Sequence, residues 1–170
     1  LDVAVIGYSM KEDGSGIRAL LVGLHDGEGW IVVASVGGGF TDETRTQWLQ
    51  KLQPLECEAD IVLVANNRLA YKWVKPSIVI QIKCIEIINE DSSGTIKKDK
   101  LTYGGNQYQS IRKSNAVSLI SPVFLGIRTD KVANVEDTGI NQLTSRIELI
   151  SNADEGADEL QKSDIIFREV

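Results

Sequence analysis

Three charged residues lie close together in the sequence, directly after an apolar run. Arg128, Asp130 and Lys131 follow residues 117–127, a segment with strand character that Pro122 interrupts. If the chain carries chemistry, we expect it where this strand delivers the three side chains to its tip. Residues 68–131 hold 11 basic and 5 acidic residues, a balance that suits a polyanionic partner. The alternative for the cluster is a solvated strand end with local ion pairing.

The rest of the composition limits the class of protein. Through Lys131 the chain has 15 basic and 15 acidic residues, and beyond it 3 and 9, so the net charge of -6 belongs to the C-terminal segment. No apolar run is long enough for a membrane helix, and no signal peptide is apparent. Cys57 and Cys84 with a single histidine offer no zinc ligand set, so we predict no metal site in the chain. A reduced, cytoplasmic protein is the expectation.

The elements that must position the cluster follow from apolar patterns. Short apolar runs at 3–8, 19–24 and 30–36 predict three strands, the last two joined by the turn residues Asp26-Gly-Glu-Gly29. Thr41 can cap a helix whose apolar face repeats at Trp48, Leu49 and Leu52. Residues 77–88 and 117–128 predict two more strands. Three strands, a helix and two strands are the order of a five-stranded Greek-key barrel, the OB-fold.

The segments outside this order are less regular. Residues 90–115 are polar and contain several glycines, which predicts an extended loop or a decorated hairpin. From Val135 on, Ile140, Leu143, Ile147 and Ile150 fall at helical spacing. We therefore predict an OB-fold domain over 1–131 and an acidic helical extension over 132–170, cut from something longer.

Four segments together resemble a known family. They are Leu1-Asp-Val-Ala-Val-Ile-Gly-Tyr8, Val36-Gly-Gly-Gly-Phe-Thr-Asp-Glu43, Trp73-Val-Lys-Pro-Ser-Ile-Val79 and Ile127-Arg-Thr-Asp-Lys131. In this order, with the helix between the second and the third, they resemble the OB-fold domain of ATP-dependent DNA ligases. The resemblance covers residues 1–131.

The resemblance implies a two-domain enzyme that seals nicked duplex DNA through an enzyme–AMP intermediate, with ATP and Mg²⁺ as cofactors. A nucleotidyltransferase domain of the same chain would carry the nucleophilic lysine; this fragment has no Lys-x-Asp-Gly motif and is expected neither to catalyse nor to bind a cofactor alone. The OB-fold domain would close over that domain. Arg128 and Lys131 would then orient the ATP phosphates, and Asp130 would hold the cluster or meet the partner domain, since fixed cations stabilise a departing polyphosphate.

DNA contacts are implied on a second set of residues. Phe40 matches a phenylalanine that faces the minor groove beside the nick in this family, although it could instead cap the core. The basic residues of the 90–115 region would contact the phosphate backbone, or would simply be solvated; they are Lys97, Lys98, Lys100, Arg112 and Lys113.

Two other functions share the same fold. One is a stand-alone OB-fold module for single-stranded nucleic acid, which would need more exposed aromatic residues than an aromatic content of 6% provides. The other is the OB-fold domain of an RNA ligase or capping enzyme. The Gly-x-Gly-Phe segment resembles that of DNA ligases and therefore favours DNA over RNA. In the leading interpretation the protein is a monomer.

Overall fold

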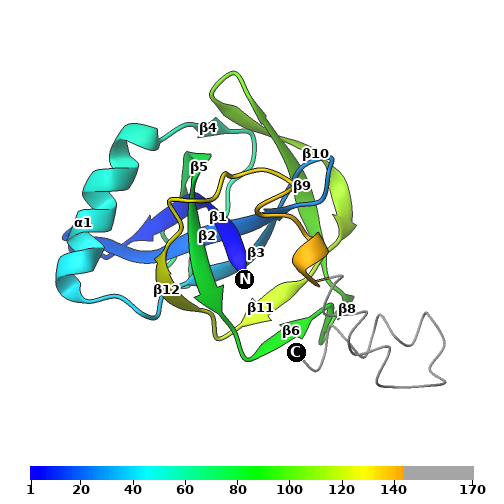
Figure 1. The fold of residues 1–170 in the computed structure, drawn as a ribbon, viewed down its shortest axis with the longest axis horizontal. Helices are drawn as coiled ribbons and strands as arrows, with labels where there is room; N and C mark the ends of the chain where they lie inside the picture. Colours follow the sequence, from blue (N-terminus) through cyan, green and yellow to red (C-terminus); the bar gives the residue numbers. More distant parts are fainter. Residues whose placement is uncertain (144–170) are drawn as a thin grey trace.

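The computed structural model describes residues 1–143 and is built mainly of strands, with one α-helix at the side (Figure 1). The elements are β1 (Asp2–Met10), β2 (Ile17–His25), β3 (Trp30–Val36), α1 (Asp42–Leu52), η1 (Gln53–Leu55), β4 (Glu58–Ala59), β5 (Lys72–Lys83), β6 (Glu86–Ile88), β7 (Glu90–Asp91), β8 (Gly94–Thr95), β9 (Lys97–Gly104), β10 (Gln107–Asn115), β11 (Ser118–Ile120) and β12 (Val123–Ile127).

Five of the strands form a barrel. β1 pairs antiparallel with β2 and with β5, β2 pairs with β3, and β5 pairs with β12. A parallel bridge between Gly38 and Val123 then joins the end of β3 to the start of β12. The pairing therefore returns to its starting strand, as in the small Greek-key barrel of the OB-fold. The predicted fold class is confirmed.

β1 is buried on both faces, which explains its unbroken apolar sequence. Val3, Val5 and Tyr8 belong to the core inside the barrel, whereas Ala4 and Ile6 belong to a second core outside it. The second core also contains Leu101 of β9 and Tyr108 of β10, so this hairpin covers the outer face of the barrel. A strand covered on both sides has no solvent-facing positions to fill with polar residues.

α1 agrees with its local sequence signals. The Thr41 side chain accepts a hydrogen bond from the backbone N–H of Thr44, and the Thr44 side chain accepts one from the backbone N–H of Thr41. Together they form a capping box that satisfies two free N–H groups of the first turn. Trp48, Leu49 and Leu52 are buried in the barrel core. In Figure 1, α1 lies beside the barrel on the side away from the β9–β10 hairpin.

The strand predicted at 77–88 has different bounds. β5 begins at Lys72, so Pro76 lies inside it rather than before it. Between the pairs Val5–Ile78 and Gly7–Trp73 the register with β1 shifts, and Pro76 falls in the unpaired part. A proline is tolerated there because no ladder hydrogen bond requires its missing N–H.

The end of the predicted strand is a separate element. β6, which covers Glu86–Ile88, leaves β5 and pairs with β11 in a small second sheet. The predicted strand at 117–128 also divides, into β11 and β12. Ser121, with φ of 52°, and Pro122 lie between the two parts, so the predicted bend is confirmed.

The polar region 90–115 consists of a short hairpin, β7–β8, and a long one, β9–β10, so the second of the two predicted alternatives, a decorated hairpin, is the one observed. β9 and β10 pair along their lengths around a turn in which Gly105 and Asn106 both have φ of 60°. Positive φ at both positions is typical of the tight turns that join twisted strands.

The described part of the C-terminal extension packs on the barrel. Residues 132–140 are turns, and helical structure begins only at Asn141. Ile140 donates a backbone hydrogen bond to His25, the Gln142 side chain bonds the backbone of Asp2, and Leu143 is buried in the barrel core. A helix beginning at Val135 is therefore wrong. The predicted positions Ile147 and Ile150 lie outside the described residues.

Candidate functional site

The Arg128 cluster is built at the end of β12. The backbone N–H of Arg128 donates to the Val79 carbonyl at 2.8 Å, which fixes the residue to β5. Its guanidinium donates through Nε and Nη2 to the two carboxylate oxygens of Asp130, at 3.0 and 2.9 Å. Nη1 donates to Asp2 Oδ1 at 3.1 Å. Two carboxylates from opposite ends of the domain thus hold one arginine, and the bidentate pair fixes the plane of its guanidinium.

The charges of this cluster are stable over a wide range of pH. The hydrogen bond from Arg128 lowers the pKa of Asp130 to about 2, and the hydrogen bond to Asp130 raises the pKa of Arg128. Both groups therefore remain charged near neutral pH. The Lys131 ammonium has no hydrogen bond or ion pair within residues 1–143. Asp130 is thus placed to orient Arg128, and Lys131 supplies a second cation that is available to a ligand.

Exposed apolar residues lie next to these charges in the sequence. Leu125 is 51% exposed, Ile127 39% and Val132 61%. Such residues flank Arg128 in sequence on both sides, at the surface rather than in either core. An apolar rim around paired charges is a composition that suits contact with another protein surface.

Phe40 sits on a glycine turn against other aromatic rings. Gly39 has φ of 94°, and a Cβ at this position would lie 2.5 Å from the Phe124 carbonyl oxygen, so only glycine fits. The Phe40 ring stacks on Phe124 with centroids 4.9 Å apart. The guanidinium carbon of Arg45 lies 5.3 Å from the Phe40 ring centroid. Phe40 is half-buried, so one part of its ring extends the core while another part remains accessible.

Two of the five basic residues assigned to DNA point inward. Lys98 Nζ donates to the Val32 and Val117 carbonyls at 2.7 and 2.8 Å, and burial lowers its pKa to about 8. Lys100 is 7% exposed, with Nζ 2.6 Å from a carboxylate oxygen of Asp26. Both amines are committed to internal partners. The predicted phosphate contacts of Lys98 and Lys100 are therefore contradicted, because the strand alternation turns these side chains toward the barrel.

The other three basic residues lie at the surface of the hairpin. Lys97 is exposed. Arg112 pairs with Glu28 at 2.5 Å, and Lys113 with Asp99 at 3.4 Å. Exposed pairs of this kind are weak and exchange readily with other anions. A phosphate contact by these three residues stays a prediction.

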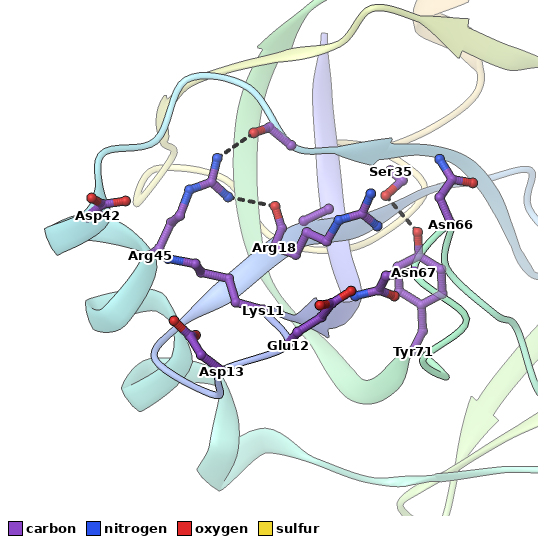
Figure 2. A pocket seen from close by; sticks show the side chains of 12 residues that line it. Lys11, Glu12, Asp13, Arg18, Ser35, Asp42, Arg45, Asn66, Asn67 and Tyr71 are labelled. Carbon is purple, nitrogen blue, oxygen red and sulfur yellow. Dashed lines mark hydrogen bonds between the residues drawn. The ribbon is translucent and has the colours of Figure 1, made fainter.

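A polar pocket beside the Phe40 turn was missed by the sequence reasoning. It has a volume of about 880 Å³ and is bordered by the β1–β2 loop, β2, the end of β3, α1 and residues 66–71 (Figure 2). Lys11, Arg18 and Arg45 bring three positive charges to its walls. These residues come from separate segments without a shared motif. No sequence signal could have grouped them.

A family model places the chain. The model described as "ATP dependent DNA ligase C terminal region" matches residues 13–131, which is most of the described domain and includes Phe40 and the Arg128 cluster. The chain belongs to this family. The match therefore confirms the resemblance to DNA ligases, rather than to RNA ligases or capping enzymes.

Solved structures agree with this ligase domain in fold. The ligase domain of LigD from M. tuberculosis aligns with a TM-score of 0.51 at 20% identity, covering 78% of this chain and 36% of that one. A mycobacterial DNA ligase D complexed with ATP and MES gives a TM-score of 0.51 at 20% identity, with 78% and 35% covered. At this identity the likeness shows the fold alone. The ligase domain described here spans about a third of those chains.

The remaining comparisons are negative. No curated protein matches this ligase domain. Within residues 1–143, no helix is long and apolar enough to cross a membrane. The same residues contain no group of three His, Cys, Asp or Glu side chains that could hold a metal ion.

Proposed function

We propose that this chain is the OB-fold domain of an ATP-dependent DNA ligase that seals nicks in duplex DNA through an enzyme–AMP intermediate. In this proposal the domain closes over a nucleotidyltransferase domain of the same chain during adenylylation and then helps to hold the nicked duplex. The single observation that carries it is the Arg128–Asp130–Lys131 cluster, which lies at a strand end, inside the matched family segment and next in sequence to exposed apolar residues.

The cluster fits a triphosphate when the domain is closed. ATP, when bound, supplies the adenylyl group and releases pyrophosphate. Arg128 is held by Asp2 and Asp130, and Lys131 makes no side-chain hydrogen bond or ion pair within residues 1–143. Asp130 is 64% exposed, so a phosphate can replace it at the guanidinium with little loss. Cations that are already in position stabilise the charge of the leaving pyrophosphate without further reorganisation. The accompanying Mg²⁺ would be bound through the triphosphate.

The apolar rim supports domain closure as the step that brings the cluster to ATP. Leu125, Ile127 and Val132 would lose their solvent contact against the nucleotidyltransferase domain, which would favour the closed state. Opening would then free the domain to engage DNA. Closure steps of this kind often limit turnover.

The two steps can be separated in the complete ligase. Arg128→Ala or Lys131→Ala should slow self-adenylylation by about a hundredfold, the size typical for loss of one electrostatic contact to a developing charge. Sealing of nicks that already carry AMP should be less affected. Lys83→Ala, an exposed lysine on β5, is the matched control and should leave both steps unchanged. Equal loss in both steps would contradict the role assigned to the cluster.

Phe40 is proposed to act in the DNA-bound state. A ring on a glycine turn can press against sugars or base steps in the minor groove. Phe40→Ala should impair nick sealing but not self-adenylylation. Because Phe40 also stacks on Phe124, the thermal stability of the variant must be measured, and Phe40→Leu retains much of the packing. Normal sealing by a folded Phe40→Ala variant would assign Phe40 to the core alone.

The surface of the hairpin is proposed as an additional backbone contact. Lys97, Arg112 and Lys113 would make weak, salt-sensitive contacts with phosphates. Arg112→Gln or Lys113→Gln should lower the salt dependence of binding to nicked duplex by about one phosphate contact each. A clear preference of the chain for single strands would instead favour a single-strand-binding module.

We also propose a monomeric, cytoplasmic enzyme. Cys57 and Cys84 form no disulfide within residues 1–143, which suits a reducing compartment.

A further inference from the structure

The pocket beside the Phe40 turn contains an arginine whose side chain has no partner within residues 1–143. Arg18, on β2, is half-exposed, and its guanidinium makes no hydrogen bond or ion pair within residues 1–143. Figure 2 shows it lying across the middle of the pocket. Most arginines of this domain are engaged, as Arg45, Arg112 and Arg128 are. An unengaged arginine on a rigid strand, inside a pocket, is a group available for an anion.

Arg45 fixes the wall between this pocket and Phe40. Its Nη1 donates to the Arg18 carbonyl at 2.6 Å, and its Nη2 donates to the Gly37 carbonyl at 2.8 Å. The same guanidinium lies over the Phe40 ring. The turn that carries Phe40 is therefore tied to the strand that carries Arg18.

The opposite side of the pocket offers neutral polar groups. Tyr71 Oη donates to Ser35 Oγ at 2.7 Å, which leaves the Ser35 hydroxyl hydrogen for another acceptor. Asn66 adds a side-chain amide that has no partner within residues 1–143. Proteins bind the nucleic-acid backbone with this combination of arginine, lysine and short neutral donors.

The acidic residues of the pocket define how much negative charge it accepts. Glu12, Asp13 and Asp42 border it, and Asp13 turns back to accept hydrogen bonds from Ser15. The three positive charges of Lys11, Arg18 and Arg45 are thus matched by three negative charges. A triphosphate would be repelled at the rim, whereas a phosphodiester carries one negative charge that Arg18 alone can meet.

We propose that this pocket is a subsite for a single backbone phosphodiester of the DNA, bound by Arg18 with Lys11 as a second cation, next to the step that Phe40 contacts. The assignment rests on the proposed function, because it needs DNA on the Phe40 side of the domain. It differs from the phosphate contacts predicted for the β9–β10 hairpin. The hairpin covers the outer face of the barrel, whereas α1 borders the pocket.

The experiment measures binding of the 170-residue chain to a nicked duplex at low salt by fluorescence anisotropy. Arg18→Gln should weaken binding about tenfold and lower the salt slope by about one. Glu12→Gln should tighten binding, because it removes a carboxylate from the same pocket. Lys83→Gln removes an exposed charge on β5 and is the control, with an unchanged slope expected.

A second measurement identifies the phosphate. Single methylphosphonates, which lack the negative charge, replace the phosphates around the nick one at a time. One position should weaken wild-type binding about tenfold and should have no further effect on Arg18→Gln. ATP added as a competitor should not weaken binding of the wild-type chain to the duplex through Arg18. The pocket accepts a phosphodiester rather than a free nucleotide.

The outcomes separate this inference from the proposed function. If the wild-type chain binds nicked duplex and Arg18→Gln keeps its affinity, slope and methylphosphonate profile, the subsite is overturned while the ligase assignment stands. If ATP competes through Arg18, the pocket is a nucleotide site and the inference is again overturned. If the wild-type chain shows no salt-dependent binding to nicked duplex, the DNA-binding part of the proposed function fails first.

Discussion

Lys98 of β9, a half-buried residue whose amine donates to two backbone carbonyls, gives a pH dependence of stability with a definite sign. Burial lowers the pKa of Lys98 from 10.5 to about 8 in the folded chain. Between these values the unfolded chain binds more protons than the folded chain, so the free energy of unfolding rises with pH. Below about pH 8 both states are protonated and the contribution is constant. The full free-energy cost of burying the charged amine is about 3 kcal/mol. As the amine loses its proton, the free energy of unfolding rises by about 1.4 kcal/mol per pH unit at most.

Other titrating groups limit the pH range in which Lys98 dominates the change in the free energy of unfolding to about pH 8 to 9. Burial raises the pKa of Cys57 from 9.0 to about 11, and it also raises the pKa values of Tyr8 and Tyr108. These are acids that stay protonated in the folded chain, so they reduce stability as the pH rises further. Above pH 9.0, the ordinary value for a cysteine thiol, the loss from Cys57 offsets the gain from Lys98.

The perturbation is Lys98→Met, which keeps an unbranched side chain, shorter by one atom, and removes its charge. The Val32 and Val117 carbonyls lose their donor, a cost of about 1–3 kcal/mol that does not depend on pH. The diagnostic quantity is therefore the slope. Urea unfolding followed by tryptophan fluorescence should show a rise of about 1 kcal/mol between about pH 8 and 9 in the wild type and none in the variant.

Lys97→Met, at the exposed neighbouring position, should keep the wild-type slope. Equal slopes for the wild type and Lys98→Met would refute the reasoning, because the ammonium would then be hydrated in the folded chain. The same variant tests the corrected DNA assignment. Lys98→Met should leave the salt dependence of DNA binding unchanged.

Two substitutions near Phe40 test the local structure. Gly39→Ala should lower the free energy of unfolding by more than about 1 kcal/mol and displace Phe40, because its methyl group would meet the Phe124 carbonyl. Near-ultraviolet circular dichroism reports the ring stacking. Gly105→Ala, at a positive φ with no atom nearby, is the milder control. Thr41→Ala should cost about 1 kcal/mol in thermal unfolding through loss of the helix cap, and Thr41→Ser should recover most of it; an equal loss in both variants would contradict the capping role.

The sequence by itself determined the features that depend on neighbouring residues. The helix of 42–52 followed from Thr41 and the spacing of Trp48, Leu49 and Leu52, because a cap and an apolar stripe act within a few turns. The strand of 30–36 followed from its apolar run and the preceding turn. The order of these elements, with four short motifs, was enough to predict the barrel and the family.

Only the tertiary structure decided where the charges go. In sequence Lys97, Lys98 and Lys100 are one basic group, but the register of β9 exposes the first and buries the amines of the other two against Val32 and Asp26. Likewise, Asp2 and Arg128 meet because β1 and β12 both pair with β5.

The pocket of Arg18 is the strongest case. Its walls come from strands, a helix and loops, including residues 66–71, that only the folded chain brings together. A side chain becomes available to a ligand when the folded chain leaves it without a partner. That property belongs to the surroundings of Arg18 and cannot be found in the residue or its neighbours in sequence.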